Sequence, residues 1–374
     1  MNVASEVLGV QELNRALLAR QSLLERSAAS ALEMIERLVG LQAQAPWPPY
    51  YGLWSRLAGF HQDELVHLLT DRRVVRIGLM RGTVHLVSAA DCRTLRPLTQ
   101  PILDRALRSN FRGSLDGLEL PALFAAGRAL VEARPHTMSE LGARLAEDPR
   151  WTGWAPAALA QAVRAGVPLV QVPPRGIWGV GGQTRVTSAE AWLGRPLHSE
   201  PSIEDVVLRY LAAFGPATVK DVQTWMGVTR LKPVLDRLRS RLAVFRDDQG
   251  KELFDLPDAP RPGPDTEAPV RFVAEFDNIL LSHADRRRIM SEEARKRTLG
   301  VPNGVFPGTF LVDGFVGGTW RIERSSKAAA LHLTPYEPLD ATTRDALVAE
   351  GARLLTFAAG ETADHDIRFV LAEQ

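Results

Sequence analysis

Two glutamines stand one residue apart in the stretch GLQAQAPWPPYYGLWSRL, which runs from Gly40 to Leu57. Neither Gln42 nor Gln44 can act as an acid or a base at neutral pH, because an amide offers only a carbonyl acceptor and an NH₂ donor. Two such groups can still hold a water molecule and orient it. If the pair does chemistry, that chemistry depends on positioning rather than on proton transfer.

The two amides lie on one side of the chain only if the segment is extended, since alternate residues of a strand share a face. In a helix Gln42 and Gln44 would diverge by about 200°. Three prolines occur within the five residues after Gln44 and oppose a continuing helix. We therefore expect the preceding helix to end near Leu41 and the pair to converge.

Aromatic side chains crowd the residues after the glutamines. Trp47 and Tyr50 could stack on an unpaired base, which contributes about 1–3 kcal/mol per base, or could anchor the loop by packing, and both interpretations stay open. Trp54 falls on the apolar side of a predicted helix, and packing is the favoured interpretation there.

The motif LMRGTVHLV contains two further candidates. Strand alternation puts His85 on one face with Thr83 and Val87, where a lone histidine is more often structural than functional. Arg81 could meet a DNA phosphate or cap a turn.

The segment EFDNILLSHADRRRIM gathers polar side chains: Asp277, Asn278, Ser282, His283, Asp285, Arg286, Arg287 and Arg288. Turn capping is the favoured interpretation for the first two. The three arginines form the only dense basic run, and either a solvated turn or phosphate contact would explain them. A metal-dependent hydrolase that uses Asp277, His283 and Asp285 is a weaker alternative.

Composition excludes several classes of protein. The chain has 374 residues, 45% of them hydrophobic and 24% charged, which is typical of a globular protein with two or three subdomains. One cysteine rules out a disulfide framework or a cysteine-based zinc site, and a reducing cytoplasm fits best. The net charge of only +1 means that any DNA-binding surface must be local. We expect neither a signal peptide nor a membrane span.

Three helix starts pair a hydroxyl with a carboxylate three residues on, as in a capping box: Ser30 with Glu33, Thr137 with Glu140, and Thr218 with Asp221. After the second and third starts, the patterns predict another helix and then paired strands, at 169–172 with a return strand, and at 242–245 with 252–256. Helix, turn, helix and hairpin make a winged helix. In a looser first copy, a helix at 65–69 precedes strands at 74–79 and 83–87, and the glutamine loop lies between helices.

From residue 258 the Pro-rich stretch DAPRPGPDTEAP leads into alternating strands, with Asp313-Gly314 as a hairpin turn, a helix at 342–355 and a last strand at 367–371. The expected fold is therefore α+β, with tandem winged-helix motifs around a concave face and a C-terminal β-rich subdomain. We expect four parts: N-terminal helices and the first winged helix at 1–120, the second at 121–195, the third at 196–258, and the β-rich subdomain at 259–374.

The glutamine stretch, LMRGTVHLV, EFDNILLSHADRRRIM and GTFLVDGFVGGTWR together resemble the winged-helix DNA glycosylases typified by AlkZ and YcaQ. The resemblance runs from about Leu13 to Phe369. The AlkZ-like branch carries Gln, an aliphatic residue and Gln, which stands here as Gln42-Ala43-Gln44, whereas the YcaQ-like branch has an acidic residue in the third position.

The resemblance implies a monofunctional DNA glycosylase of the cytoplasm and nucleoid, monomeric and without metal or organic cofactor. Its partner would be double-stranded DNA with alkylated purines. It would excise bulky N7-alkylguanine adducts and unhook interstrand crosslinks, in repair or in self-resistance to a genotoxin. Gln42 and Gln44 would be catalytic, and the candidates for DNA contact are Trp47, Tyr50, Arg81, His85, Asn278, His283, Arg286, Arg287 and Arg288. Tandem winged helices alone would equally fit a transcriptional regulator without catalytic activity.

Overall fold

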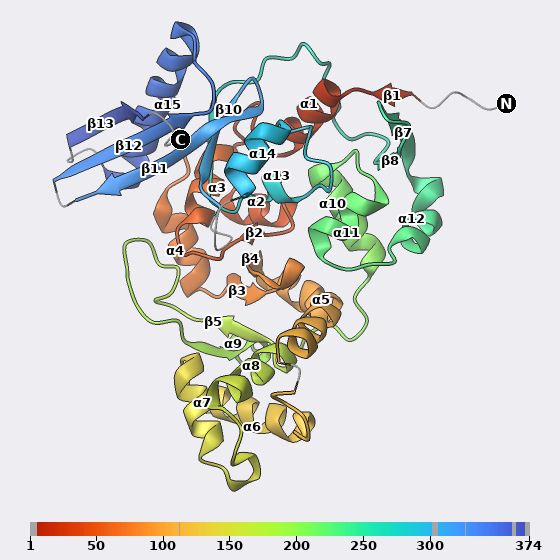
Figure 1. The fold of residues 1–374 in the computed structure, drawn as a ribbon, viewed down its shortest axis with the longest axis vertical. Helices are drawn as coiled ribbons and strands as arrows, with labels where there is room; N and C mark the ends of the chain where they lie inside the picture. Colours follow the sequence, from red (N-terminus) through yellow and green to blue (C-terminus); the bar gives the residue numbers. More distant parts are fainter. Residues whose placement is uncertain (1–5, 112, 301–305, 326, 361–363, 371–374) are drawn as a thin grey trace.

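A computed structural model describes residues 6–111, 113–300, 306–325, 327–360 and 364–370 of the chain. Within these ranges the strands form two sheets of five strands and one of three, and helices pack around them (Figure 1). No helix in these ranges is long and apolar enough to cross a membrane.

The central sheet has the strand order β2-β4-β3-β5-β6, with every neighbouring pair antiparallel. Its strands are β2 (Leu41–Gln42), β3 (Val74–Gly78), β4 (Val84–Ser88), β5 (Leu169–Gln171) and β6 (Val186–Ser188). The hairpins predicted for the first and second winged helices are confirmed. Because β3 pairs with β5, both hairpins belong to one sheet, and β2 adds Gln42 at its edge.

Two of the helices around this sheet, α2 and α7, begin where the capping boxes predict. The hydroxyls of Ser30 and Thr137 each accept a hydrogen bond from the backbone N–H three residues on, and each carboxylate reaches back. The helices are α2 (Ala31–Arg37), α3 (Pro48–Arg56), α4 (Gln62–Thr70), α5 (Ala89–Asn110), α6 (Leu120–Ala133), α7 (Met138–Ala146), α8 (Pro156–Gly166) and α9 (Ala189–Leu193). Between β3 and β4 lies a single 3-10 turn, Met80–Gly82.

The third unit also has the predicted order of helix, helix and hairpin. Its elements are α10 (Ile203–Phe214), α11 (Val219–Met226), α12 (Lys232–Leu238), β7 (Ala243–Asp247) and β8 (Glu252–Asp255). Thr218 caps α11 as predicted. The short β1 (Val7–Leu8), just before α1 (Val10–Arg20), runs parallel to β7, a long-range pairing that the local sequence pattern does not reveal.

The C-terminal part holds the other five-stranded sheet, in the order β13-β12-β11-β10-β9. Its elements are β9 (Arg271–Val273), α13 (Asn278–Leu281), α14 (Glu292–Leu299), β10 (Gly308–Val312), β11 (Phe315–Arg324), β12 (Ala328–Pro335), α15 (Ala341–Ala359) and β13 (Asp364–Phe369). The turn at Asp313-Gly314 is confirmed, with φ of 45° and 81°. The last strand starts earlier than predicted, and residue 371 lies outside the described residues.

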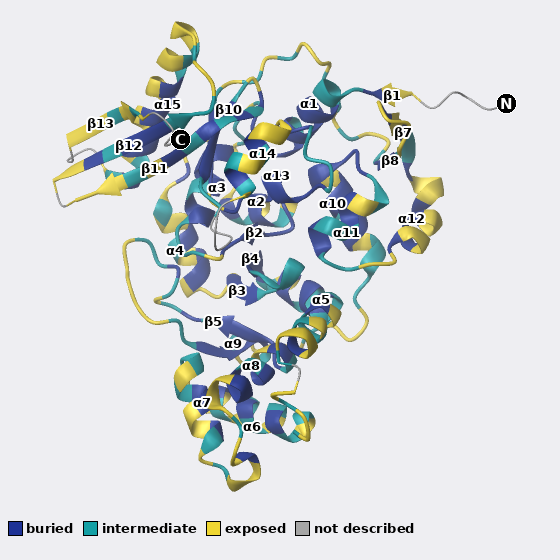
Figure 2. Cartoon of the chain, in the orientation of Figure 1, coloured by how far each residue is buried: buried dark blue, intermediate teal, exposed yellow. Residues whose placement is uncertain are grey.

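Figure 2 shows the central strands among the most buried parts of the molecule. Side chains of α3, which follows the glutamine loop, share a hydrophobic core with the C-terminal sheet, including Tyr50, Leu53, Phe272 and Phe310. The predicted segments are thus joined by shared sheets and cores. Their boundaries remain predictions.

Candidate active site

A sharp turn connects α2 to β2 and so places the glutamine segment at the edge of the central sheet. The helix ends at Arg37, and Val39 and Gly40 then adopt positive φ angles of 54° and 95°. A Cβ atom on Gly40 would lie 2.5 Å from Cγ1 of Val87, so both the conformation and the close approach require glycine. The prediction that the helix does not run through the pair is confirmed.

Gln42 lies in β2 opposite His85 of β4 and is 6% exposed. Its Oε1 accepts a hydrogen bond of 2.6 Å from Nη2 of Arg81. Its amide nitrogen has no hydrogen-bond partner among the described residues, yet it is not one of the unpaired polar atoms sealed from solvent. The amide therefore directs its oxygen into the protein and keeps an NH₂ group available.

Gln44 is exposed, and its Oε1 accepts a hydrogen bond of 3.2 Å from the backbone N–H of Val84. Its side chain borders a cavity of about 440 Å³. The oxygens of Gln42 and Gln44 are thus both held by the segment 81–84. This shared orientation leaves both NH₂ groups without an acceptor among the described residues.

Arg81 organises the site from the turn between β3 and β4, where its φ is 55°. Besides Gln42, its guanidinium donates to the Trp225 carbonyl at 2.7 Å and to Oδ1 of Asn278 at 3.1 Å. Nδ2 of Asn278 in turn donates to the Gly40 carbonyl at 3.1 Å. Asn278, expected to contact DNA, is instead buried and fixes the turn behind the glutamines.

Arg76 was not singled out from the sequence, although it supports the same loop from β3. Its guanidinium donates to the Ala43 carbonyl at 2.7 Å, to the Ala45 carbonyl at 3.4 Å, and to Oε1 of Gln171 at 3.2 Å. The available signal was a charged residue inside an otherwise apolar strand, VVRIG.

Neither of these arginines forms an ion pair with a carboxylate of the described residues. Burial lowers the pKa of Arg76 to about 10, and burial with a lesser effect of Arg286 lowers the pKa of Arg81 to about 10. Both guanidinium groups remain protonated at neutral pH. The glutamine loop therefore lies between two positive charges that no carboxylate of the described residues pairs with.

The aromatic cluster mainly packs. Tyr50 is fully buried and its hydroxyl donates to the Gly176 carbonyl at 2.6 Å, so the expectation that it stacks on a base is wrong. Trp47 is half-buried and contacts Trp178 edge to face, with ring centroids 5.6 Å apart. Trp54 is buried, as predicted. Trp178, which sequence reasoning missed, comes from the loop between β5 and β6.

His85 lies wholly inside the protein, so the expectation of direct DNA contact is wrong. Its Nδ1 is 3.1 Å from the Thr83 carbonyl, while its Nε2 is sealed from solvent and has no hydrogen-bond partner in the described part of the chain. Burial, reinforced by Arg81, lowers the pKa of His85 to about 3, which keeps the ring neutral behind Gln42.

His283 was also expected at the DNA surface, and burial contradicts that. It is 1% exposed and its Nε2 is 3.0 Å from the Phe214 carbonyl. Asp277 caps α13, as predicted, and forms a buried ion pair with Arg56 across two 2.8 Å contacts. The described residues contain no group of three or more His, Cys, Asp or Glu placed to hold a metal ion, so the residues of the hydrolase alternative do not converge.

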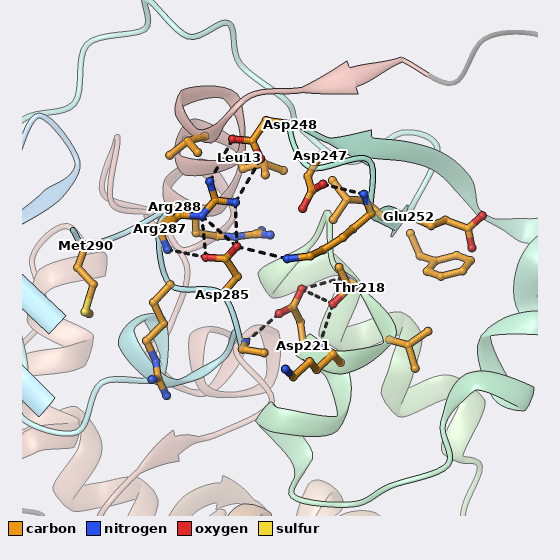
Figure 3. A pocket seen from close by; sticks show the side chains of 18 of the residues that line it. Leu13, Thr218, Asp221, Asp247, Asp248, Glu252, Asp285, Arg287, Arg288 and Met290 are labelled. Carbon is orange, nitrogen blue, oxygen red and sulfur yellow. Dashed lines mark hydrogen bonds and ion pairs between the residues drawn. The ribbon is translucent and has the colours of Figure 1, made fainter. Parts of the chain in front are cut away.

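The three consecutive arginines have three different environments, around a pocket of about 630 Å³ drawn in Figure 3. Arg287 contacts the carboxylates of Asp285 and Asp248. Arg288 is buried and donates to the Pro216 carbonyl at 2.7 Å. Arg286 donates to the Leu280 carbonyl at 2.9 Å and forms no ion pair within the described ranges. The predicted basic patch therefore reduces to one uncompensated, half-buried arginine.

A family model for AlkZ-like DNA glycosylases matches residues 35–357, which include both glutamines, Arg76, Arg81 and Asn278. The chain belongs to the AlkZ-like DNA glycosylases. The family membership favours an enzyme over the regulator that tandem winged helices alone would allow, and as a DNA glycosylase the protein binds DNA.

A protein and a solved structure from Streptomyces sahachiroi each resemble this glycosylase along nearly its whole length. One, an interstrand DNA cross-link repair glycosylase, is 24% identical over 377 aligned residues, which cover 90% of this chain and 92% of that protein. The solved structure of the DNA glycosylase AlkZ superposes with a TM-score of 0.79 at 22% identity, over 97% of this chain and 100% of the other. The second comparison confirms the expected α+β fold.

Proposed function

We propose that this glycosylase hydrolyses the N-glycosidic bond of N7-alkylguanine in double-stranded DNA, with Gln42 and Gln44 positioning the attacking water. The observation that carries the proposal is the arrangement of the two amides. Arg81 and the Val84 N–H hold their oxygens, and no group of the described residues accepts a hydrogen bond from either NH₂. Each NH₂ group can donate to the oxygen of a water molecule, and amides that are already held in place position that water without reorganising during the reaction.

The substrate class follows from the lack of a general acid in the glutamine loop. Alkylation at N7 gives guanine a positive charge, so the base leaves without prior protonation. Water oxygen bonds to C1′, the bond from C1′ to N9 breaks, its electron pair neutralises the base, and the water proton passes to solvent. His85, the titratable side chain opposite Gln42, is neutral and sealed, which supports a reaction without a general acid.

The charges around the loop support DNA as the partner. Arg76 and Arg81 keep their positive charge and have no carboxylate partner among the described residues. A phosphodiester strand beside the loop would be attracted by these buried charges through space, without direct contact to either guanidinium group. We place Arg286 at the same interface, because it forms no ion pair within the described ranges and its charge acts on Arg81.

The relative named for interstrand cross-link repair supports crosslinked guanines as further substrates, since each crosslinked base would carry the same N7 charge. A role in self-resistance to a genotoxin that forms such adducts fits the same chemistry. The reaction is monofunctional in this proposal, because water rather than a lysine attacks the sugar.

The test uses a duplex with a single N7-methylguanine, incubated with enzyme and then heated in mild alkali to break the strand at abasic sites. Gln42→Ala and Gln44→Ala should each slow single-turnover excision by about 10²–10³-fold while DNA affinity and melting temperature stay unchanged. Gln249→Ala, in the exposed turn between β7 and β8, is the matched control and should be as active as the wild type.

Excision should persist in EDTA, and borohydride should trap no enzyme linked to DNA. Intact DNA after incubation with the wild-type enzyme would refute the proposed substrate. Full activity of the double glutamine variant would refute the proposed roles of the amides.

A further inference from the structure

The cavity of about 440 Å³ beside Gln44 has no role in the reaction as described so far. It lies between the central sheet, α5 and α8, and its lining is mainly apolar, with Leu103, Leu107, Phe111 and Leu169 among the contributors. Its volume falls in the range of about 300–1,000 Å³ that is usual for sites of drug-sized ligands. A methyl group would leave such a space almost empty.

The charge of this cavity distinguishes it from the larger pocket in Figure 3. Asp221, Asp248 and Asp285 line the larger pocket together with several basic residues. In contrast, no aspartate or glutamate occurs among the described residues that line the cavity at Gln44. Its charged side chains are two arginines, and four further polar side chains are amides.

Both arginines of the cavity lack a carboxylate partner in the described part of the chain. Arg96 is 2% exposed and donates to Oε1 of Gln100 and to the Ala165 carbonyl. Burial lowers its pKa to about 10, so it stays charged at neutral pH. Arg164 is exposed on α8. The cavity is therefore lined by apolar side chains and by two positive charges, and an ammonium group inside it would contact no carboxylate among the described lining residues.

We propose that this cavity receives the substituent carried on N7 of guanine, and that it selects bulky, ring-containing substituents that are neutral or anionic over substituents with an ammonium group. The inference rests on the proposed function, in which Gln44 positions the water that attacks the sugar, and Gln44 also borders the cavity. With Gln44 at the rim, the reacting nucleotide lies at the mouth. The N7 substituent is then the part of the substrate that extends into the interior.

A substitution that fills the cavity tests the size preference. Ala106 lines the cavity from α5 and is half-buried, so Ala106→Trp places a large side chain into the space. Ala90→Trp, at an exposed position of α5 outside the lining, is the matched control. Duplexes of one sequence carry either N7-methylguanine or N7-(2-naphthylmethyl)guanine, and kcat/KM for excision is measured on each.

Ala106→Trp should lower kcat/KM for the naphthylmethyl duplex by about 10- to 100-fold, the effect of losing burial of one large apolar group, while excision of methylguanine changes by less than about twofold. The control should lower neither. Equal losses on both duplexes would overturn the inference, since the cavity would then serve the DNA strand itself. No loss on either duplex would also overturn it.

Charge selection needs a second pair of probes of matched size, N7-(4-carboxybenzyl)guanine and N7-[4-(aminomethyl)benzyl]guanine. The wild-type enzyme should prefer the carboxybenzyl duplex, and Arg164→Glu should reduce or reverse that preference. Arg105→Glu, an exposed residue of α5 outside the lining, should leave the preference unchanged.

An unchanged ratio in Arg164→Glu would overturn the charge argument. Failure of the proposed function looks different, because the wild-type enzyme would then excise none of these bases, methylguanine included. A wild-type enzyme that excises methylguanine but not naphthylmethylguanine would leave the proposed function standing and refute only the role of the cavity.

Discussion

Replacing Arg81 with methionine should slow excision by loosening Gln42 rather than by removing a group that touches the substrate. Nη2 of Arg81 lies 2.6 Å from Oε1 of Gln42, and a hydrogen bond from a charged donor contributes about 1.5–3 kcal/mol. The terminal torsion of a glutamine is broad and roughly two-fold. Without Arg81 the amide can reverse and present its oxygen where the NH₂ group is needed.

The size of the effect follows from that one contact. Each 1.36 kcal/mol corresponds to a factor of ten, so the loss of orientation predicts a decrease of about 10- to 150-fold in the single-turnover rate. The effect cannot exceed that of Gln42→Ala if Arg81 acts only through Gln42. Arg81→Lys keeps the charge but has a single nitrogen for three acceptors, so its rate should be intermediate.

The assay is a double-mutant cycle on the N7-methylguanine duplex, with wild type, Arg81→Met, Gln42→Ala and the double variant. The double variant should be no slower than Gln42→Ala, which corresponds to complete coupling. Melting temperatures of all four proteins correct for the lost contacts to Trp225 and Asn278. The reasoning is refuted if Arg81→Met slows Gln42→Ala by the same factor as it slows the wild type.

Three further predictions concern the supports of the site. Gly40→Ala should lower the free energy of unfolding by about 1–3 kcal/mol in denaturant titrations, because φ is 95° and the new methyl group would clash. Gly59→Ala, with φ of 74° and no neighbour within 4 Å, should lower the free energy of unfolding by less. Equal losses in the two variants would mean that backbone strain alone, and not the clash, causes the effect. The pKa of His85 is about 3 in the folded protein and 6.5 in the free side chain, so between these pH values the unfolded chain binds more protons. The contribution of His85 to the free energy of unfolding is therefore complete above pH 6.5, and it decreases by up to about 1.4 kcal/mol per pH unit as the pH falls towards 3. His85→Leu should remove that part of the pH dependence, and an unchanged slope would contradict the buried, neutral assignment. Arg286→Ala should reduce the slope of the log binding constant against log salt concentration by about 0.9. Arg287 already pairs with carboxylates, so Arg287→Ala should change this slope less. A larger change in Arg287→Ala than in Arg286→Ala would mean that the DNA does not contact Arg286.

The sequence determined the features that depend on neighbours a few residues apart. A capping box closes within four residues, which is why the helix starts at Ser30, Thr137 and Thr218 were predictable. The turn at Asp313-Gly314 and the strands on either side of it are local in the same sense. The motif of two glutamines, and the end of the helix before it, also follow from a short stretch of chain.

Only the tertiary structure decided what surrounds those glutamines. Arg81 and Asn278 meet across 197 residues, and Arg56 and Asp277 across 221, so no local pattern reveals either contact. The same applies to the pairing of β3 with β5, which joins two predicted units into one sheet.

Burial was equally invisible in the sequence. His283 and Arg286 lie three residues apart, yet packing from distant segments seals one side chain and leaves the other half-buried without an ion pair. The type of a residue limits the chemistry it can do, whereas the fold sets its exposure, its partners and therefore its charge. For this glycosylase the sequence specified the glutamine pair by itself, and packing determined which atoms of that pair lack a partner among the described residues.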